Sequence, residues 1–144
     1  MAATTPAAFD PKPRQLGSTI DCIAGGAILA GQAVVLAANG VSWTVHPSDA
    51  DTSLIEKFVG IALYSQATTG GHVAVAGMGS IILACESEGA VIDAGDNLGA
   101  GAAAGCVKTL TDADSEMIGY AIEDISANST GYIVVLPQVA LKGA

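Results

Sequence analysis

Residues 33–45 read Ala33-Val34-Val35-Leu36-Ala37-Ala38-Asn39-Gly40-Val41-Ser42-Trp43-Thr44-Val45. A short apolar run ends just before Asn39-Gly40, a dipeptide typical of the tight turn in a β-hairpin. Beyond the turn, apolar and polar residues alternate, as they do on a strand that buries one face. This alternation places Val41, Trp43 and Val45 on the same side. The stretch therefore predicts two strands joined by a turn, with Trp43 in the core.

Similar patterns recur along the chain. Short apolar runs rich in β-branched residues and separated by glycine-containing turns favour the strands of a barrel or sandwich. In the first half, the further predicted strands are 59–63, 72–75 and 80–84. Residues 49–58 differ, because Leu54, Ile55 and Phe58 have helical spacing and Ser48 or Asp49 is suited to cap a turn. The fold class that we predict is all-β, with one helical or irregular excursion.

The stretch from residue 22 to residue 45 contains no charged residue and is long enough to cross a bilayer as a helix. Four glycines interrupt it, and polar residues such as Gln32 and Ser42 dilute it. Strand, turn and strand explain this composition better than a transmembrane helix does. The first twenty residues also lack the apolar segment of a signal peptide. We therefore predict no membrane partner.

The composition predicts one folded domain. The chain has 144 residues, of which 51% are hydrophobic and 13% charged, so its core consists mainly of aliphatic side chains. Fourteen Asp and Glu residues against five Lys and Arg residues give a net charge of −9. Because phosphate groups are bound chiefly by Lys and Arg, this charge argues against nucleic acid as a partner. An anionic membrane surface is disfavoured for the same reason.

An internal repeat divides the chain into two similar halves. Four segments of the first half have counterparts in the second, in the same order and about 60 residues further on. The pairs are 27–31 with 91–95, 48–51 with 111–114, 59–62 with 118–121, and 71–75 with 131–135. Each half has too few predicted strands to close a core alone. The repeat therefore predicts one barrel-like domain built from two intertwined units.

The three cysteines, Cys22, Cys85 and Cys106, are odd in number and widely spaced. They include no CxxC pair, which argues against a disulfide framework and against a zinc site. We predict buried thiols that pack as small apolar side chains.

The side chains that commonly perform catalysis are sparse. His46 and His72, the only histidines, have no nucleophile motif beside them and are expected at a strand end and a turn. The acidic segments 49–51 and 112–114 lack the additional oxygen ligands and the bidentate Glu of a calcium loop. We therefore predict no catalytic, cofactor-binding or metal-ligating residue, and no cofactor.

Residues 1–18 differ from the rest of the chain. They contain three of the five prolines and the basic residues Lys12 and Arg14. Proline fixes φ and removes a hydrogen-bond donor, which predicts an extended arm ahead of the domain at 19–144. One interpretation is a frayed terminus. The other is a strap that binds a partner through Phe9, Lys12 and Arg14, stiffened by Pro11 and Pro13.

Several segments together resemble a known family. Residues 28–32 (ILAGQ) and 92–96 (IDAGD) open the two halves, residues 59–63 (VGIAL) precede a glycine turn, and residues 73–75 (VAV) are followed by Gly77 and Gly79. Over residues 20–140 this pattern resembles the capsid decoration (cement) proteins of tailed phages and related viruses. These proteins are similar to the head-stabilising protein of lambda-type phages.

The resemblance implies a compact β-tulip barrel without enzymatic activity. It implies a virion protein, made in the host cytoplasm, that sits on the outer capsid surface and stabilises the shell. Its partner is the major capsid protein, and it acts as a homotrimer at three-fold or quasi-three-fold sites. By position and composition, residues 2–18 match the family's capsid-binding arm. The expected contact residues there are Phe9, Pro11, Lys12, Pro13 and Arg14.

Two other classes of function stay open on the sequence. A β-rich adhesion domain that recognises a glycan or a host surface needs aromatic faces, and the candidates are Trp43, Tyr64, Tyr120 and Tyr132. An enzyme needs a pocket with a perturbed acid or base. No motif in the sequence indicates such a pocket.

Overall fold

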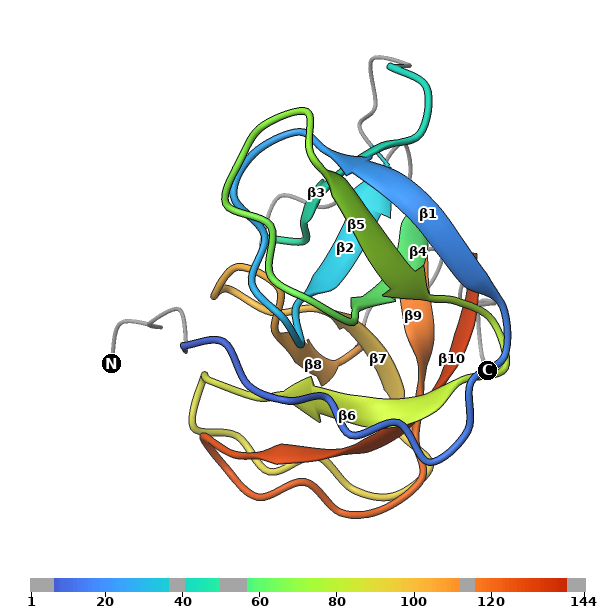
Figure 1. Ribbon diagram of the computed structural model, residues 1–144. Coiled ribbons are helices and arrows are strands. Elements are labelled where there is room, and N and C mark those ends of the chain that lie inside the picture. Colours follow the sequence, from blue (N-terminus) through green and yellow to red (C-terminus); the bar gives the residue numbers. More distant parts are fainter. Residues whose placement is uncertain (1–6, 37–40, 50–56, 112–115, 140–144) are drawn as a thin grey trace.

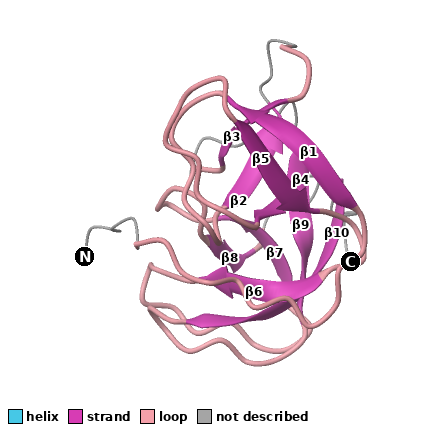
Figure 2. Ribbon diagram, in the orientation of Figure 1, coloured by secondary structure: helices cyan, strands magenta, loops and turns pink. Residues whose placement is uncertain are grey.

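The computed structural model describes residues 7–36, 41–49, 57–111 and 116–139, and all regular structure in them is β (Figure 2). This confirms the predicted fold class, a single compact all-β domain. No helix in these residues is long and apolar enough to cross a membrane. The strands are β1 (Thr19–Ala24), β2 (Ala33–Leu36), β3 (Thr44–Pro47), β4 (Phe58–Ala62), β5 (His72–Ala76), β6 (Ile81–Cys85), β7 (Asn97–Ala100), β8 (Val107–Thr109), β9 (Glu116–Ala121) and β10 (Thr130–Val139).

The first five strands form a closed barrel in the order β1-β3-β2-β4-β5 (Figure 1). The barrel closes because β1 pairs with β5 on one edge, antiparallel, and with β3 on the other, parallel. Alternate side chains point into it, and its interior holds the buried cluster Cys22, Ala24, Ile28, Val34, Val45, Ala62, Val73 and Val75. The prediction that neither half can close a core was therefore wrong for the first half.

The second five strands repeat this arrangement in an open sheet of order β6-β10-β9-β7-β8. Matching β1–β5 with β6–β10 in sequence order gives the same neighbours in both halves, except that β8 does not pair with β6 as β3 pairs with β1. The predicted internal repeat is thus confirmed as a structural repeat.

One glycine in each half lies at an equivalent close approach between strands. A Cβ on Gly60 of β4 would lie 1.9 Å from the carbonyl oxygen of Ala76, and a Cβ on Gly119 of β9 would lie 1.9 Å from that of Val134. Both positions exclude any side chain, because real Cβ atoms do not approach an oxygen so closely.

A second core joins the halves. Its buried side chains come from both, including Val35, Phe58 and Ile61 of the first half and Ile118 and Ile133 of the second. Polar contacts add to it. The Gln32 amide donates to the Ala104 carbonyl at 3.2 Å, and Lys57 pairs with the buried Glu116. The two units therefore share a core, but each sheet is built from the strands of one half alone, so the prediction of intertwined units was wrong for the strands.

Trp43 corrects the hairpin prediction. It precedes β3 with a positive φ of 62°, and the residue is 62% exposed. Val41 is also exposed, while Val45 is fully buried. The alternation fails because the backbone at Trp43 is left-handed, which ends the strand geometry N-terminal to Thr44. The Asn39-Gly40 turn and most of the predicted excursion at 49–58 lie outside the described residues.

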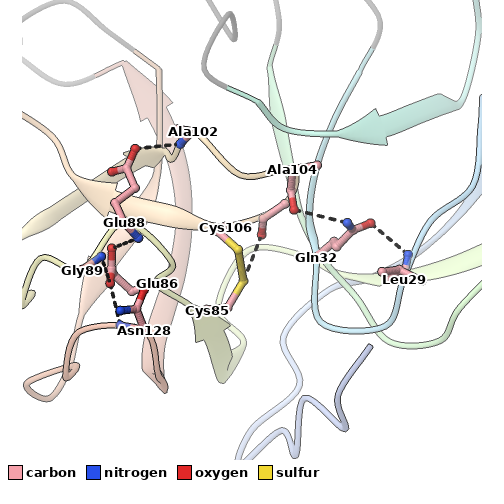
Figure 3. Close-up of a disulfide and its surroundings, with 11 residues drawn as sticks. Leu29, Gln32, Cys85, Glu86, Glu88, Gly89, Ala102, Ala104, Cys106 and Asn128 are labelled. Atoms are coloured by element: carbon pink, nitrogen blue, oxygen red, sulfur yellow. Dashed lines mark hydrogen bonds between the residues drawn. A yellow bond between two sulfur atoms is a disulfide. The ribbon is translucent and has the colours of Figure 1, made fainter. Parts of the chain in front are cut away.

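The cysteine prediction was also partly wrong. Cys85 and Cys106 form a disulfide, and only Cys22 is a free, buried thiol (Figure 3). The bond joins the end of β6 to the loop before β8, two segments that the fold brings together although they are 21 residues apart in sequence. Beside it, the buried Glu86 carboxylate accepts backbone N–H bonds from Glu88 (2.6 Å), Gly89 (3.1 Å) and Asn128 (2.8 Å). This carboxylate has a structural role.

Candidate functional site

The described part of the N-terminal arm lies along the outer edge of β6 (Figure 1, dark blue). Backbone bonds run from Leu83 N–H to the Pro11 carbonyl (3.0 Å), from Ile81 N–H to the Gln15 carbonyl (2.9 Å) and from Arg14 N–H to the Ile81 carbonyl (2.8 Å). Gln15 and Ile81 form an antiparallel bridge. The arm therefore occupies the edge of β6 that corresponds to the edge of β1 taken by β3.

Two of the five predicted contact residues are used within the chain. Pro11 is buried, and Phe9 is half-buried against the cluster formed by Cys85, Ala103 and Cys106. The Phe9 ring lies over Gly31, within 2.4–2.7 Å of where a Cβ would stand on that residue. These two side chains anchor the arm to the disulfide region.

The other three predicted residues, Lys12, Pro13 and Arg14, are exposed and adjacent. Lys12 has a φ of 42°, a left-handed conformation that the Asp10 carboxylate supports by accepting the Lys12 N–H at 3.0 Å. The Arg14 guanidinium lies 4.4 Å from the centre of the Tyr132 ring. The Tyr132 hydroxyl donates to the Lys12 carbonyl at 3.0 Å. Tyr132 thus fixes both ends of this exposed segment.

We define the basic arm site as Lys12, Pro13, Arg14 and Tyr132. It groups two of the five basic residues in a chain with a net charge of −9. Lys57, by contrast, is paired with Glu116. The basic arm site is suited to an anionic partner surface, which it would meet with a charge and an aromatic ring that are already oriented.

From the sequence, Tyr132 was only an aromatic candidate for sugar binding, and its contact with the arm was not predicted. The internal repeat could have drawn attention to Tyr132. Tyr132 corresponds to His72 in the first half, and both lie in a strand that pairs with the first strand of its half, His72 opposite Ile23 and Tyr132 opposite Leu83. Their neighbours differ, because His72 contacts Asp21 whereas Tyr132 contacts the arm.

The remaining chemical groups form no cluster in the described residues. No group of three or more His, Cys, Asp or Glu side chains there is placed to hold a metal ion. Cys22 lies inside the first barrel, where burial and, secondarily, the negative charge of Asp21 raise the pKa of its thiol above 9.0. A thiol in this state is a poor nucleophile. The segments 49–51 and 112–114 lie largely outside the described residues.

Comparison with known proteins gives a likeness of fold. No protein-family model and no curated protein sequence matches the chain. Among solved structures, the chain is similar to the N base of the head fiber gp8.5 of bacteriophage phi29, with a TM-score of 0.54 and 16% sequence identity over 83% of this chain and 93% of that chain. The fold of this chain therefore also occurs in a phage head protein.

Proposed function

We propose that the protein is a non-enzymatic component of a phage virion that decorates the outer capsid surface. In this proposal it binds the major capsid protein and stabilises the shell by bridging neighbouring subunits, as a homotrimer at three-fold or quasi-three-fold sites. The observation that carries the proposal is the fold, which a phage head fiber base shares over most of both chains.

The basic arm site supports the proposal at the level of residues. A decoration protein acts through buried interface area, and a typical specific interface buries roughly 1,600 Å². Charges at its rim mainly steer association and set its salt dependence. Arg14, held over Tyr132 on an edge of the molecule, offers such a charge in an otherwise acidic chain. Repetition over the symmetric shell strengthens each weak contact through avidity.

The test is cryo-electron microscopy of shells mixed with the purified protein, compared with bare shells from the same source. The proposal predicts added density at three-fold or quasi-three-fold sites, and shells that withstand more heating. Absence of added density at saturating protein would overturn it.

A matched pair of variants tests the role of the arm. Arg14→Ala should weaken binding to shells at least tenfold and reduce its salt dependence, because it removes an interface charge. Lys108→Ala removes a charge of the same sign from the exposed face of β8 and should leave binding unchanged. Equal losses in both variants would indicate that only net charge matters, and would remove the basic arm site from the interface.

A further inference from the structure

Trp43, the only tryptophan of the chain, is displayed at the surface at a conformational cost. Its positive φ is unfavourable for a bulky residue, and its exposed ring forgoes the stabilisation that burial would give. Strained backbone of this kind persists where the surroundings hold it in place, and it concentrates at functional sites. The Trp43 carbonyl is indeed fixed, since it accepts the Ile23 N–H at 2.8 Å.

The ring borders a shallow groove on the outside of the first barrel. The groove has a volume of about 610 Å³ and is lined by Thr19, Ile20, Asp21, Ile23, Trp43 and His72. Along β1, Thr19, Asp21 and Ile23 point outward, while Cys22 and Ala24 point into the barrel. His72 stands opposite Ile23 in the pairing of β1 with β5. The floor is therefore the outer surface of the paired strands β1 and β5.

The polar groups of the groove are already positioned. His72 Nδ1 lies 3.1 Å from Asp21 Oδ2, and both side chains are largely exposed to solvent. The second carboxylate oxygen of Asp21, the other ring nitrogen of His72 and the Thr19 hydroxyl stay available for a ligand, since no described residue bonds them. The groove thus combines one flat aromatic face with a short row of hydrogen-bonding groups.

We propose that this groove, defined as the Trp43 groove, binds an uncharged oligosaccharide. A pyranose ring presents a face of C–H groups that stacks on an indole ring, and a rim of hydroxyls that a carboxylate, an imidazole and a Thr hydroxyl can bond. Anionic sugars are disfavoured by Asp21 and by the net charge of −9. No Lys or Arg stands among the described residues that line the groove, which disfavours a phosphate-bearing ligand there. This activity is separate from capsid binding, which we assign to the basic arm site.

The single tryptophan provides a direct assay. The full chain is titrated with chitotriose, maltotriose and cellotriose while the intrinsic tryptophan fluorescence is recorded. We expect a saturable change in intensity with at least one of the three sugars, because the only fluorescent indole lies in the site. Isothermal titration calorimetry then measures the affinity of the variants, including those that lack the indole.

Three variants locate the site. Trp43→Ala should abolish binding, and Asp21→Asn should weaken it about tenfold, because the amide keeps the shape but loses the charged acceptor. Tyr64→Ala removes another exposed aromatic side chain, one that is outside the groove, and should bind as the unchanged chain does. Thermal unfolding of each variant checks that the fold is retained.

Two outcomes would overturn the proposal. One is the absence of saturable binding to any of the three sugars. The other is self-association of the unchanged chain in sedimentation that Trp43→Ala abolishes, together with sugar binding that Trp43→Ala leaves intact; this would make Trp43 a contact between copies. Capsid binding would survive either outcome, since it is tested through Arg14.

Discussion

The close approach of neighbouring strands in each half requires a glycine, Gly60 in the first half and Gly119 in the second. Each lies where the neighbouring strand's carbonyl oxygen would be 1.9 Å from a Cβ. We expect Gly60→Ala and Gly119→Ala each to lower the free energy of unfolding by at least about 3 kcal/mol, because the strands must separate to admit one methyl group. Urea denaturation followed by circular dichroism measures the loss.

Gly26→Ala is the matched control for both substitutions. A Cβ on Gly26 would meet no atom within 4 Å, and this residue has no positive φ. The free energy of unfolding of the Gly26→Ala variant should differ from that of the unchanged chain by less than about 1 kcal/mol. Equal effects at Gly26 and Gly60 would mean that chain entropy, and not the close approach of strands, explains the need for glycine.

Cys22 predicts a pH dependence of stability. Burial, with a smaller contribution from Asp21, raises the pKa of its thiol in the folded state above the unfolded value of 9.0. Below pH 9 the thiol is protonated in both the folded and the unfolded state, so it adds no pH dependence to the free energy of unfolding. Above pH 9 the unfolded state loses the proton first, which favours unfolding. The melting temperature of the unchanged chain should therefore fall more steeply between pH 8.5 and 10.5 than that of Cys22→Ala; parallel curves would refute the assignment.

The exposure of Trp43 and the pairing of the cysteines could not be predicted from the sequence. Strand periodicity predicts the burial of Val45 correctly, yet it fails for Trp43, because nothing in a pattern of apolar residues reports a left-handed backbone. Three cysteines allow three possible pairings. Choosing between a disulfide and free thiols requires the distance between the end of β6 and the loop before β8, which only the tertiary structure supplies.

Among the elements, the arm has the least expected position. In the second sheet β8 does not reach β6, which would leave the N–H groups of Ile81 and Leu83 facing solvent. Open strand edges invite pairing with other chains. Residues 11–15 pair with this edge of β6. They take the place beside β6 that β3 takes beside β1 in the first half. The described part of the arm therefore belongs to the folded domain.

Deleting residues 1–18 should consequently lower the free energy of unfolding by about 2–4 kcal/mol, because it removes the three backbone hydrogen bonds to β6 described above and the burial of Phe9 and Pro11. Chemical denaturation of the truncated and full chains measures this difference. Arg14→Ala, which removes only an exposed contact with Tyr132, should cost about 1 kcal/mol or less. An unchanged stability of the truncated chain would show that the arm is energetically independent of β6.

The strands themselves were largely predictable. The predicted strands 59–63, 72–75 and 80–84 match β4, β5 and β6 to within one residue at each end, because each is a short apolar run between glycine turns. The arm was predictable as extended from its prolines. The pairing of the arm with β6 was not predictable, because the hydrogen bonds that hold it are made by backbone groups and do not depend on residue type.

At the scale of the molecule, the repeat in the sequence correctly predicted two equivalent halves but not how they differ. Closure of the first barrel depends on the pairing of Ile23 with Thr44 and of Ala24 with Val45. In the second half the arm, and not β8, pairs with the matching edge of β6. A likeness of segments between the halves could not report this, because the arm lies outside the repeat.

The shared core predicts that the halves unfold together, although the first barrel has an interior cluster of its own. Ile133 of β10 is fully buried in the shared core, and Ile133→Ala should cost about 2–5 kcal/mol. If unfolding is cooperative, this substitution lowers the hydrogen-exchange protection of the slowest amides in β1–β5 as much as in β6–β10. Tyr64→Ala, at the surface, should change neither set. Protection that persists in β1–β5 while β6–β10 lose theirs would instead mean that the closed barrel is a separate folding unit, and that the shared core only docks the second sheet onto it.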